Sequence, residues 1–252
     1  MKKIYLFLTA LMLCVAAGAQ TTIKGDVNGD GTVDIADVTE VVNIILNPDS
    51  DDDTPVLPDT PTTGSRAVDL GLSVKWASCN VGATSPEEYG GYYAWGETEE
   101  KSDYSWSTYK YCNGTYDSMT KYCTSSSYGT VDNKTTLEPE DDVASVKWGG
   151  NWRMPTTEEQ QELIDKCTWE WTTLNGVNGY RVTGPNGNSI FLPGAGYRDG
   201  AGVYEGSAGN CWSSSLGSSS SNNAYFLAFF SPTYYRYSYY RYDGLTVRPV
   251  CP

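Results

Sequence analysis

Apolar and polar positions change their spacing several times along the 252-residue chain, and each spacing predicts a different element. In VDLGLSVKW (68–76) every second residue is apolar, which is the period of a half-buried strand. NGYRVTG (178–184) and NSIFLPGAGYR (188–198) predict two further strands, and Asn/Gly turns precede each of them. GLTVRPVC (244–251) predicts a short strand close to the C-terminus.

One segment has helical spacing instead, WRMPTTEEQQELIDKC. Thr156 can accept a hydrogen bond at the helix N-terminus while Glu159 reaches back to it, which is a capping box. Leu163 and Ile164 supply the buried face of this helix. One helix among many short strands and long polar loops predicts an α+β fold for residues 66–252.

The segment YYRYSYYRYD (234–243) fits none of these patterns, because six of the nine residues from Tyr234 to Tyr242 are tyrosine. Read as a strand, it has no aliphatic side, so we predict an exposed loop or an edge strand. Tyrosine, serine and arginine are also the residues of antibody binding loops, where tyrosine gives a large contact area with few torsions to order.

Strand alternation divides this segment into two sides. Tyr235, Tyr237, Tyr239 and Arg241 share one side, and the other side has Tyr234, Arg236, Ser238, Tyr240 and Tyr242. We predict that all nine contact a ligand, together with Trp212 and Ser214 beside the serine-rich stretch SSSLGSSSSNN. The alternatives are a solvated serine loop and Ser/Tyr low complexity that has arisen by drift.

Composition divides the chain into four parts. Residues 1–19 have two lysines, an apolar run and a small-residue end, which predicts a secretory signal and an exported protein, extracellular, on the outer surface or periplasmic. A lipoprotein signal at Cys14 is the alternative, although Leu13 is large for one. A possible ion-binding segment (20–48), a Pro-rich acidic linker (49–65) and a domain of 187 residues (66–252) follow.

Residues 20–48 contain DVNGDGTVDIAD, whose oxygen ligands have the spacing of a calcium-binding loop, with glycine where the loop turns. The predicted Ca²⁺ ligands are Asp26, Asn28, Asp30, the backbone carbonyl of Thr32, Asp34 and Asp37. The alternative is an acidic turn without an ion. The stretch resembles one half of a type I dockerin, an EF-hand-like family in which paired repeats bind calcium and dock onto a cohesin. The resemblance implies calcium binding, and a cohesin-like partner is a further expectation.

The formal net charge of −14 and the lack of basic clusters argue against nucleic acid as a partner. The chain has no histidine, so it has neither an imidazole-based triad nor a histidine-ligated metal. The six cysteines after the signal permit disulfides but lack zinc-ligand spacing. No apolar run after the signal reaches the length of a membrane-spanning helix.

Blocks along residues 66–252 resemble a known family, and they occur in the order VDLGLSVKWASCNVGA, YYAWGETE, WGGNWRMPTTEE, NSIFLPGAGYR, CWSSS and DGLTVRPV. They resemble the fibrobacterial major paralogous domain of gut Bacteroidetes, in the formylglycine-generating-enzyme-like branch of the C-type lectin-like superfamily. The resemblance implies a C-type lectin-like fold whose first and last strands pair, here 66–76 with 244–250. Some diversity-generating retroelement targets share this superfamily, which implies that residues 213–243 are a diversified surface.

Three functions are compatible with these observations. The first is a secreted or cell-surface protein that captures a protein or a glycan through the Tyr/Arg/Ser-rich surface. The alternative is a non-catalytic, carbohydrate-binding, dockerin-bearing component of polysaccharide degradation. An enzyme is the third, and we expect none because no nucleophile is recognisable and the acidic pairs Glu97/Glu99 and Asp141/Asp142 lie locally on the chain.

Overall fold

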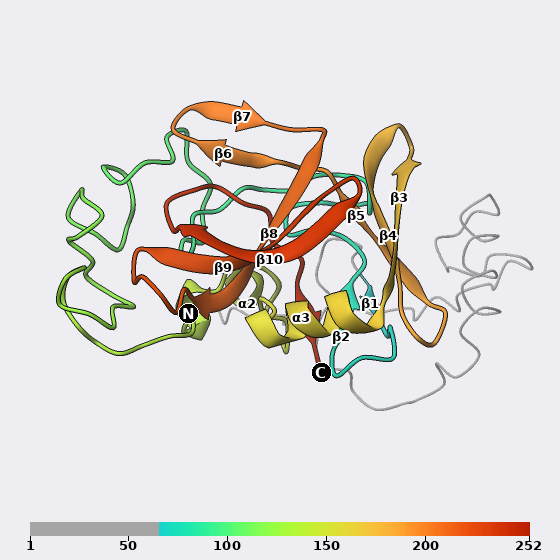
Figure 1. Ribbon diagram of the computed structural model, residues 1–252, viewed down its shortest axis with the longest axis horizontal. Helices are drawn as coiled ribbons and strands as arrows, with labels where there is room; N and C mark the ends of the chain where they lie inside the picture. The colour runs from blue at the N-terminus through green and yellow to red at the C-terminus, as the bar shows by residue number, and fades with distance from the viewer. Residues whose placement is uncertain (1–65) are drawn as a thin grey trace, which may run out of the picture. The chain divides into compact units, whose positions relative to one another are not determined.

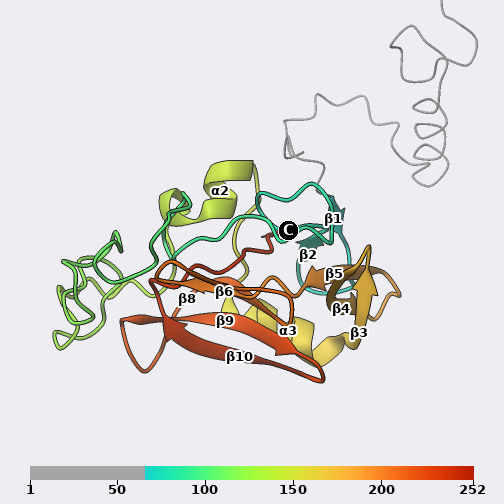
Figure 2. The ribbon, with the colours of Figure 1, turned by 90° about the horizontal axis from the view of Figure 1, so that it is seen from above.

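The structure, a computed structural model, describes residues 66–252 (Figures 1 and 2). The predictions made for residues 1–65, including the signal, the calcium loop and the linker, lie outside the described residues. The strands are β1 Ala67–Val68, β2 Lys75–Ala77, β3 Thr168–Leu174, β4 Val177–Thr183, β5 Ser189–Pro193, β6 Tyr197–Asp199, β7 Gly202–Tyr204, β8 Ala208–Leu216, β9 Asn223–Phe230, β10 Thr233–Tyr240 and β11 Val250–Cys251. The helices are the 3₁₀ turn η1 Pro139–Asp141 and the α-helices α2 Val143–Trp148 and α3 Thr157–Lys166.

Three strands from the C-terminal part of the chain form the sheet β10-β9-β8. Its middle strand, β9, reads NAYFLAFF and is apolar on both sides, because both of its faces are covered. Phe226 and Ala228 face one hydrophobic core, while Leu227 and Phe229 face another. Helix α3 packs against all three strands, and Figure 1 shows it on one side of the sheet with the β6–β7 hairpin on the other.

The local signals for α3 and for the strands β4 and β5 are confirmed, although the segment predicted as one strand over 188–198 divides into β5 and β6. Thr156 accepts from the backbone N–H of Glu159, whose side chain accepts from the backbone N–H of Thr156 in return, and Leu163 is fully buried. β4 and β5 pair antiparallel, as do β3 and β4. Asn175 and Gly176 have φ of 49° and 86° in the turn between β3 and β4, as a tight hairpin turn requires.

The predicted pairing of residues 66–76 with residues 244–250 is found only in part: Val250 of β11 lies opposite Trp76 of β2, while β1 pairs with β2 and residues 244–249 lie outside β11. The alternating segment 68–76 is wrong as one continuous strand, however, because it folds into the hairpin of β1 and β2. The chain reverses through Gly71 at a φ of 74°, and the side chain of Asp69 accepts from the Gly71 N–H. The apolar residues of 68–76 still lie in one hydrophobic core. The alternating pattern therefore predicted which side chains are buried, but it did not predict the turn between β1 and β2.

The predicted α+β, C-type lectin-like fold class is wrong, since residues 66–252 are mostly β with two α-helices of six and ten residues. Both β8 and β10 lack aliphatic alternation, so the sequence predicted no strand at β8 and only an exposed loop or an edge strand at β10. Their serine and tyrosine residues pair with β9 along its length, and tyrosine favours strands. Residues 78–138 connect β2 to η1 through turns and isolated bridges (Figure 1, cyan to green), so the loops add no helix.

Among the cysteines of residues 66–252, Cys79, Cys112, Cys123, Cys167 and Cys211 carry free thiols. Within these described residues, no helix has the length and apolarity needed to cross a bilayer.

Candidate ligand-binding site

Strand β10 lies at the edge of its sheet and pairs only with β9, from Thr233 opposite Phe230 to Tyr240 opposite Asn223. Its residues are alternately exposed and half-buried along the whole strand. The prediction of an edge strand is therefore confirmed, and tyrosine on an edge provides an amphipathic surface rather than a core face.

The exposed side of β10 is a row of three rings, Tyr235, Tyr237 and Tyr239, which we call the tyrosine row. Their exposed fractions are 39%, 53% and 45%. The ring centroids of Tyr235 and Tyr237 are 6.2 Å apart, and those of Tyr237 and Tyr239 are 6.5 Å apart. Tyr237 also meets the ring of Phe226 on β9 edge-on at 6.0 Å. The rings thus hold one another in place while leaving a large aromatic area open to a ligand.

The other side of β10 faces the protein. Tyr234 stacks on Trp169 of β3 with centroids 4.5 Å apart. The guanidinium of Arg236 donates to the side chains of Gln161 at 2.7 Å and Thr157 at 2.7 Å on α3. Ser238 is half-buried, and the Tyr240 and Tyr242 rings both contact Trp106 edge-on, at 5.7 and 4.8 Å. These predicted contact residues anchor β10, so they support the tyrosine row from behind.

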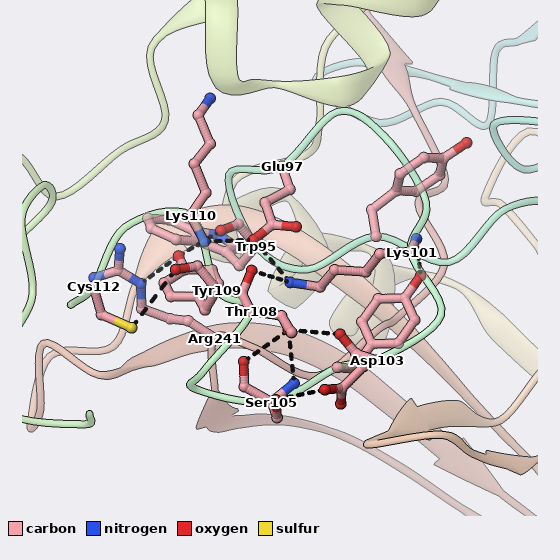
Figure 3. A network of polar contacts seen from close by, with 12 residues as sticks. Trp95, Glu97, Lys101, Asp103, Ser105, Thr108, Tyr109, Lys110, Cys112 and Arg241 are labelled. Atoms are coloured by element: carbon pink, nitrogen blue, oxygen red, sulfur yellow. Dashed lines mark hydrogen bonds and ion pairs between the residues drawn. The ribbon is translucent and has the colours of Figure 1, made fainter. Parts of the chain in front are cut away.

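Arg241 was expected beside the tyrosine row, and the structure corrects that expectation. β10 ends at Tyr240, so strand alternation stops there, and the Arg241 side chain is fully buried. Its Nε donates to the hydroxyl of Tyr109 at 2.9 Å, and its guanidinium lies over the Trp95 ring at 5.0 Å (Figure 3). Its other N–H groups donate to the carbonyls of Tyr122 at 3.0 Å, Ser221 at 2.7 Å and Lys121 at 3.0 Å.

The acid nearest to this network in Figure 3 binds other partners. Glu97 accepts from Lys101 Nζ at 2.9 Å and from the backbone N–H of Lys110 at 2.8 Å. Within residues 66–252 no carboxylate forms an ion pair with Arg241. Neutral oxygens and aromatic rings therefore replace water around this buried charge, and Arg241 fastens the end of β10 to the long loop.

The prediction that Trp212 and Ser214 contact a ligand is also wrong, because both lie in β8 with buried side chains. Trp212 Nε1 donates to the carbonyl of Tyr93 at 2.8 Å, and the Ser214 hydroxyl donates to the carbonyl of Pro155 at 3.3 Å. The first part of the serine-rich stretch is therefore a strand. Neither residue is available to a ligand.

A cavity of about 320 Å³ lies next to the tyrosine row. It is bounded by β6, β8, β9, the end of β10 and the chain that follows β10. Its lining residues are Tyr197, Asp199, Ala208, Asn210, Phe226, Tyr239, Asp243 and Leu245. Its volume is at the small end for a ligand pocket, and it combines aromatic walls with a few polar groups. Sequence reasoning missed it, because its residues come together only through the pairing of distant strands.

Asp243 is the most unusual group of this cavity. It is 5% exposed, and its Oδ1 has no hydrogen-bond partner among the described residues. Burial, and then the nearby charge of Asp199, raise the pKa of Asp243 to about 8. A buried oxygen without a donor is costly, so this position suits a ligand that donates hydrogen bonds.

Replacing Asp243 by asparagine should change how stability depends on pH. The unfolded chain releases this proton near its ordinary pKa of 3.8, whereas the folded chain keeps it to about pH 8. The stabilising contribution of the protonated acid is therefore complete below about pH 4 and decreases as the pH rises to about 8. The amide of the Asp243→Asn variant does not titrate, so we expect the variant to gain about 4 kcal/mol relative to wild type between pH 5 and pH 9.

Urea unfolding at both pH values measures this difference. The titratable groups that face Asp243 are Asp199, Tyr197, Tyr239 and Tyr242. Asp199→Asn, which removes only the neighbouring charge, should show a smaller pH effect of the same sign. Parallel stability curves for wild type and Asp243→Asn would show that this acid is ionised in the folded protein.

A second, larger cavity of about 600 Å³ lies on the α3 side of the sheet. Hydroxyl groups dominate its lining, together with Arg236 and Glu158. The Arg236 guanidinium is already bonded to α3, and the tyrosine row faces the other way. We therefore place the candidate site at the tyrosine row and the smaller cavity beside it.

An acidic group formed by Glu138, Glu140 and Asp141 is a third candidate, with geometry that could hold a metal ion. Lys121 Nζ lies among these carboxylates, 2.6 Å from Glu138 and 2.5 Å from Asp141. Burial alone would raise the pKa of Asp141, but hydrogen bonds from Lys121, Tyr111 and Tyr122 lower it to about 2. The ammonium group supplies the cation here, so this group is a structural ion-pair network.

Comparison with known proteins yields one match. Residues 24–62 match the dockerin type I domain. The matched segment contains every predicted calcium ligand from Asp26 to Asp37 and extends into the segment predicted as a linker. No curated protein and no solved structure matches the chain, so the comparisons do not support the C-type lectin-like resemblance or retroelement diversification. The chain thus has a segment that matches the dockerin type I domain, followed in the sequence by the mostly β residues 66–252.

Proposed function

We propose that this protein is an exported, non-catalytic carbohydrate-binding component of polysaccharide degradation. Its dockerin segment would attach it to a larger assembly, and its tyrosine row would hold the glycan. The observation that carries the proposal is the tyrosine row itself, three exposed rings fixed on an edge strand beside a cavity with polar groups. Protein capture by the same row is the second reading, since tyrosine also dominates protein interfaces.

Two features favour a glycan over a protein ligand. A dockerin segment is typical of components that act on polysaccharides outside the cell, and residues 24–62 match that domain. The surface that includes the tyrosine row also has a small cavity at its edge, lined by both aromatic and polar side chains. Aromatic faces cover the apolar face of a sugar ring, and the polar groups fix its hydroxyls.

Calcium belongs to the dockerin segment in this proposal. The donor set of Asp26, Asn28, Asp30, Asp34 and Asp37, with the Thr32 carbonyl, consists entirely of oxygen and fits Ca²⁺. When bound, the ion would order the loop and the short helix that follows it, which is marginal alone. The glycan site would not need calcium, because Lys121 occupies the acidic group of Glu138, Glu140 and Asp141, the group of described residues whose geometry could hold a metal ion.

Calcium removal should therefore separate the two activities. We expect EDTA to lower cohesin binding by the full-length protein at least tenfold, because the loop loses the ion that orders it. Asp30→Ala should do the same, whereas the control Asp117→Asn, outside the matched segment, should bind normally. Titration calorimetry with Ca²⁺ and with a type I cohesin measures both steps. Calcium-independent docking would contradict the assignment of these ligands.

A polysaccharide panel tests the proposed function directly. The full-length protein, assayed by affinity electrophoresis, should be retarded by at least one plant or host polysaccharide, with and without EDTA. No reducing sugar should be released from that polysaccharide on prolonged incubation. Failure to bind any polysaccharide would overturn the proposal in favour of a protein ligand, and release of sugar would show an enzyme.

A further inference from the structure

The two carboxylates of the small cavity have no basic partner. Within the described residues, none of the ion pairs includes Asp199 or Asp243. Arg198 is next to Asp199 on β6, but adjacent strand residues point to opposite faces. Its guanidinium lies 4.5 Å from the centre of the Tyr92 ring instead. The cavity is therefore an acidic site without a counter-ion in the protein.

Aromatic rings enclose this acidic pair. Tyr239 comes from the tyrosine row, and Phe226 comes from β9. Tyr197 of β6 is held in place by stacking on Tyr204 of β7, with centroids 4.8 Å apart. A cation is attracted to the face of an aromatic ring, and a carboxylate forms its strongest hydrogen bonds with a charged donor.

The unpartnered Oδ1 of Asp243 gives an independent reason to expect a donor at this place. Asp243 lines the cavity, and its Oδ1 is a buried oxygen without a hydrogen-bond partner among the described residues. An ammonium group carries three N–H donors and no acceptor, so it can serve both carboxylates at once. A neutral hydroxyl would supply one donor but no positive charge, so it would not favour the ionised form of Asp243 as an ammonium group does.

We propose that this cavity binds the primary ammonium group of an amino sugar, with Asp243 and Asp199 as its counter-ions and Tyr239 and Tyr197 as its walls. The proposal rests on the proposed function, and it names the class of glycan. The adjoining sugar rings would lie along Tyr237 and Tyr235, so an oligosaccharide with unacetylated 2-amino groups is the ligand of choice. Acetylation would remove the positive charge of the amino group and would make the group larger than the space between the two carboxylates and the rings.

The test compares a glucosamine hexamer with the N-acetylglucosamine hexamer, by calorimetry at pH 7 on the full-length protein. We expect the amine form to bind at least tenfold more tightly than the acetylated form. Asp243→Asn and Asp199→Asn should each reduce this preference to less than threefold. Asp117→Asn removes one charge from an exposed loop and should leave the preference unchanged. Thermal unfolding of each variant confirms that it is folded.

Each alternative result has a definite meaning. Equal affinity for the two hexamers, or an amine preference that survives both aspartate substitutions, would overturn this inference and leave glycan binding intact. Binding of neutral glycans alone would do the same. A third result would be binding of a lysine peptide, lost in Asp243→Asn and Asp199→Asn, without binding of the glucosamine hexamer. That result would overturn the assignment of the amine to a sugar. Failure to bind any glycan would remove the proposed function and this inference together.

Discussion

Replacing Arg241 by alanine should lower the free energy of unfolding of residues 66–252 by about 3–5 kcal/mol, because four hydrogen bonds from a buried charged donor are lost at once. The guanidinium is fully buried and donates to Tyr109 and to three backbone carbonyls. Its loss would leave those acceptors buried without a donor, and each of them is costly. The Trp95 and Tyr109 rings would also lose the cation that lies over them.

Urea unfolding followed by tryptophan fluorescence measures this effect, because all eight tryptophans lie between residues 76 and 212. Arg236→Ala is the matched control, since Arg236 is only part-buried and bonds to one helix. We expect it to cost about 1 kcal/mol. A loss below about 1 kcal/mol for Arg241→Ala, together with weaker ligand binding, would place Arg241 in the ligand surface, as the sequence alone suggested.

Elements with a complete local signal could be predicted from the sequence. Helix α3 has its capping box and its buried leucine within ten residues of chain. β3, β4 and β5 are joined by short turns whose glycines permit positive φ, at Gly176 and Gly187. In both cases the residues that decide the structure are neighbours in sequence, so the pattern carried enough information.

The roles of the two arginines in the tyrosine segment could not be predicted in this way. Alternation placed Arg241 with the tyrosine row, but alternation holds only while the strand lasts, and β10 ends at Tyr240. The partners of Arg241 include Tyr109 and Tyr122, 132 and 119 residues away. Contacts at such separation depend on the whole fold, and periodicity contains no information about them.

The same difference between local and long-range contacts explains which part of the candidate site could be predicted. The tyrosine row was predicted as an exposed edge, because neither side of the segment was aliphatic. The cavity beside it was not predicted, since Asp199 and Asp243 belong to different parts of the chain and lie together through the bridge between Arg198 and Gly244. A lone acid in a loop has no distinguishing local signal, and only its burial in the fold makes Asp243 unusual.

Replacing Tyr237 by alanine should weaken binding of the polysaccharide that the protein holds most tightly by about 2 kcal/mol, roughly 30-fold. Tyr237 is the middle ring of the tyrosine row and the most exposed of the three, at 53%. Its ring contacts Tyr235, Tyr239 and Phe226, so it is ordered before any ligand arrives and little entropy is lost on binding. Affinity electrophoresis of the two proteins measures the change.

Tyr116→Ala is the matched control for this prediction, because Tyr116 is 54% exposed but lies in the long loop, away from β10. It removes the same ring from an equally exposed position, so a general effect of aromatic area would appear in both variants. Tyr237→Ala should cost less than about 1 kcal/mol in unfolding free energy, since the ring is half-exposed on an edge strand. Equal retardation of both variants would move the ligand away from the tyrosine row, whereas a selective loss at Tyr237 without unfolding would assign it to binding.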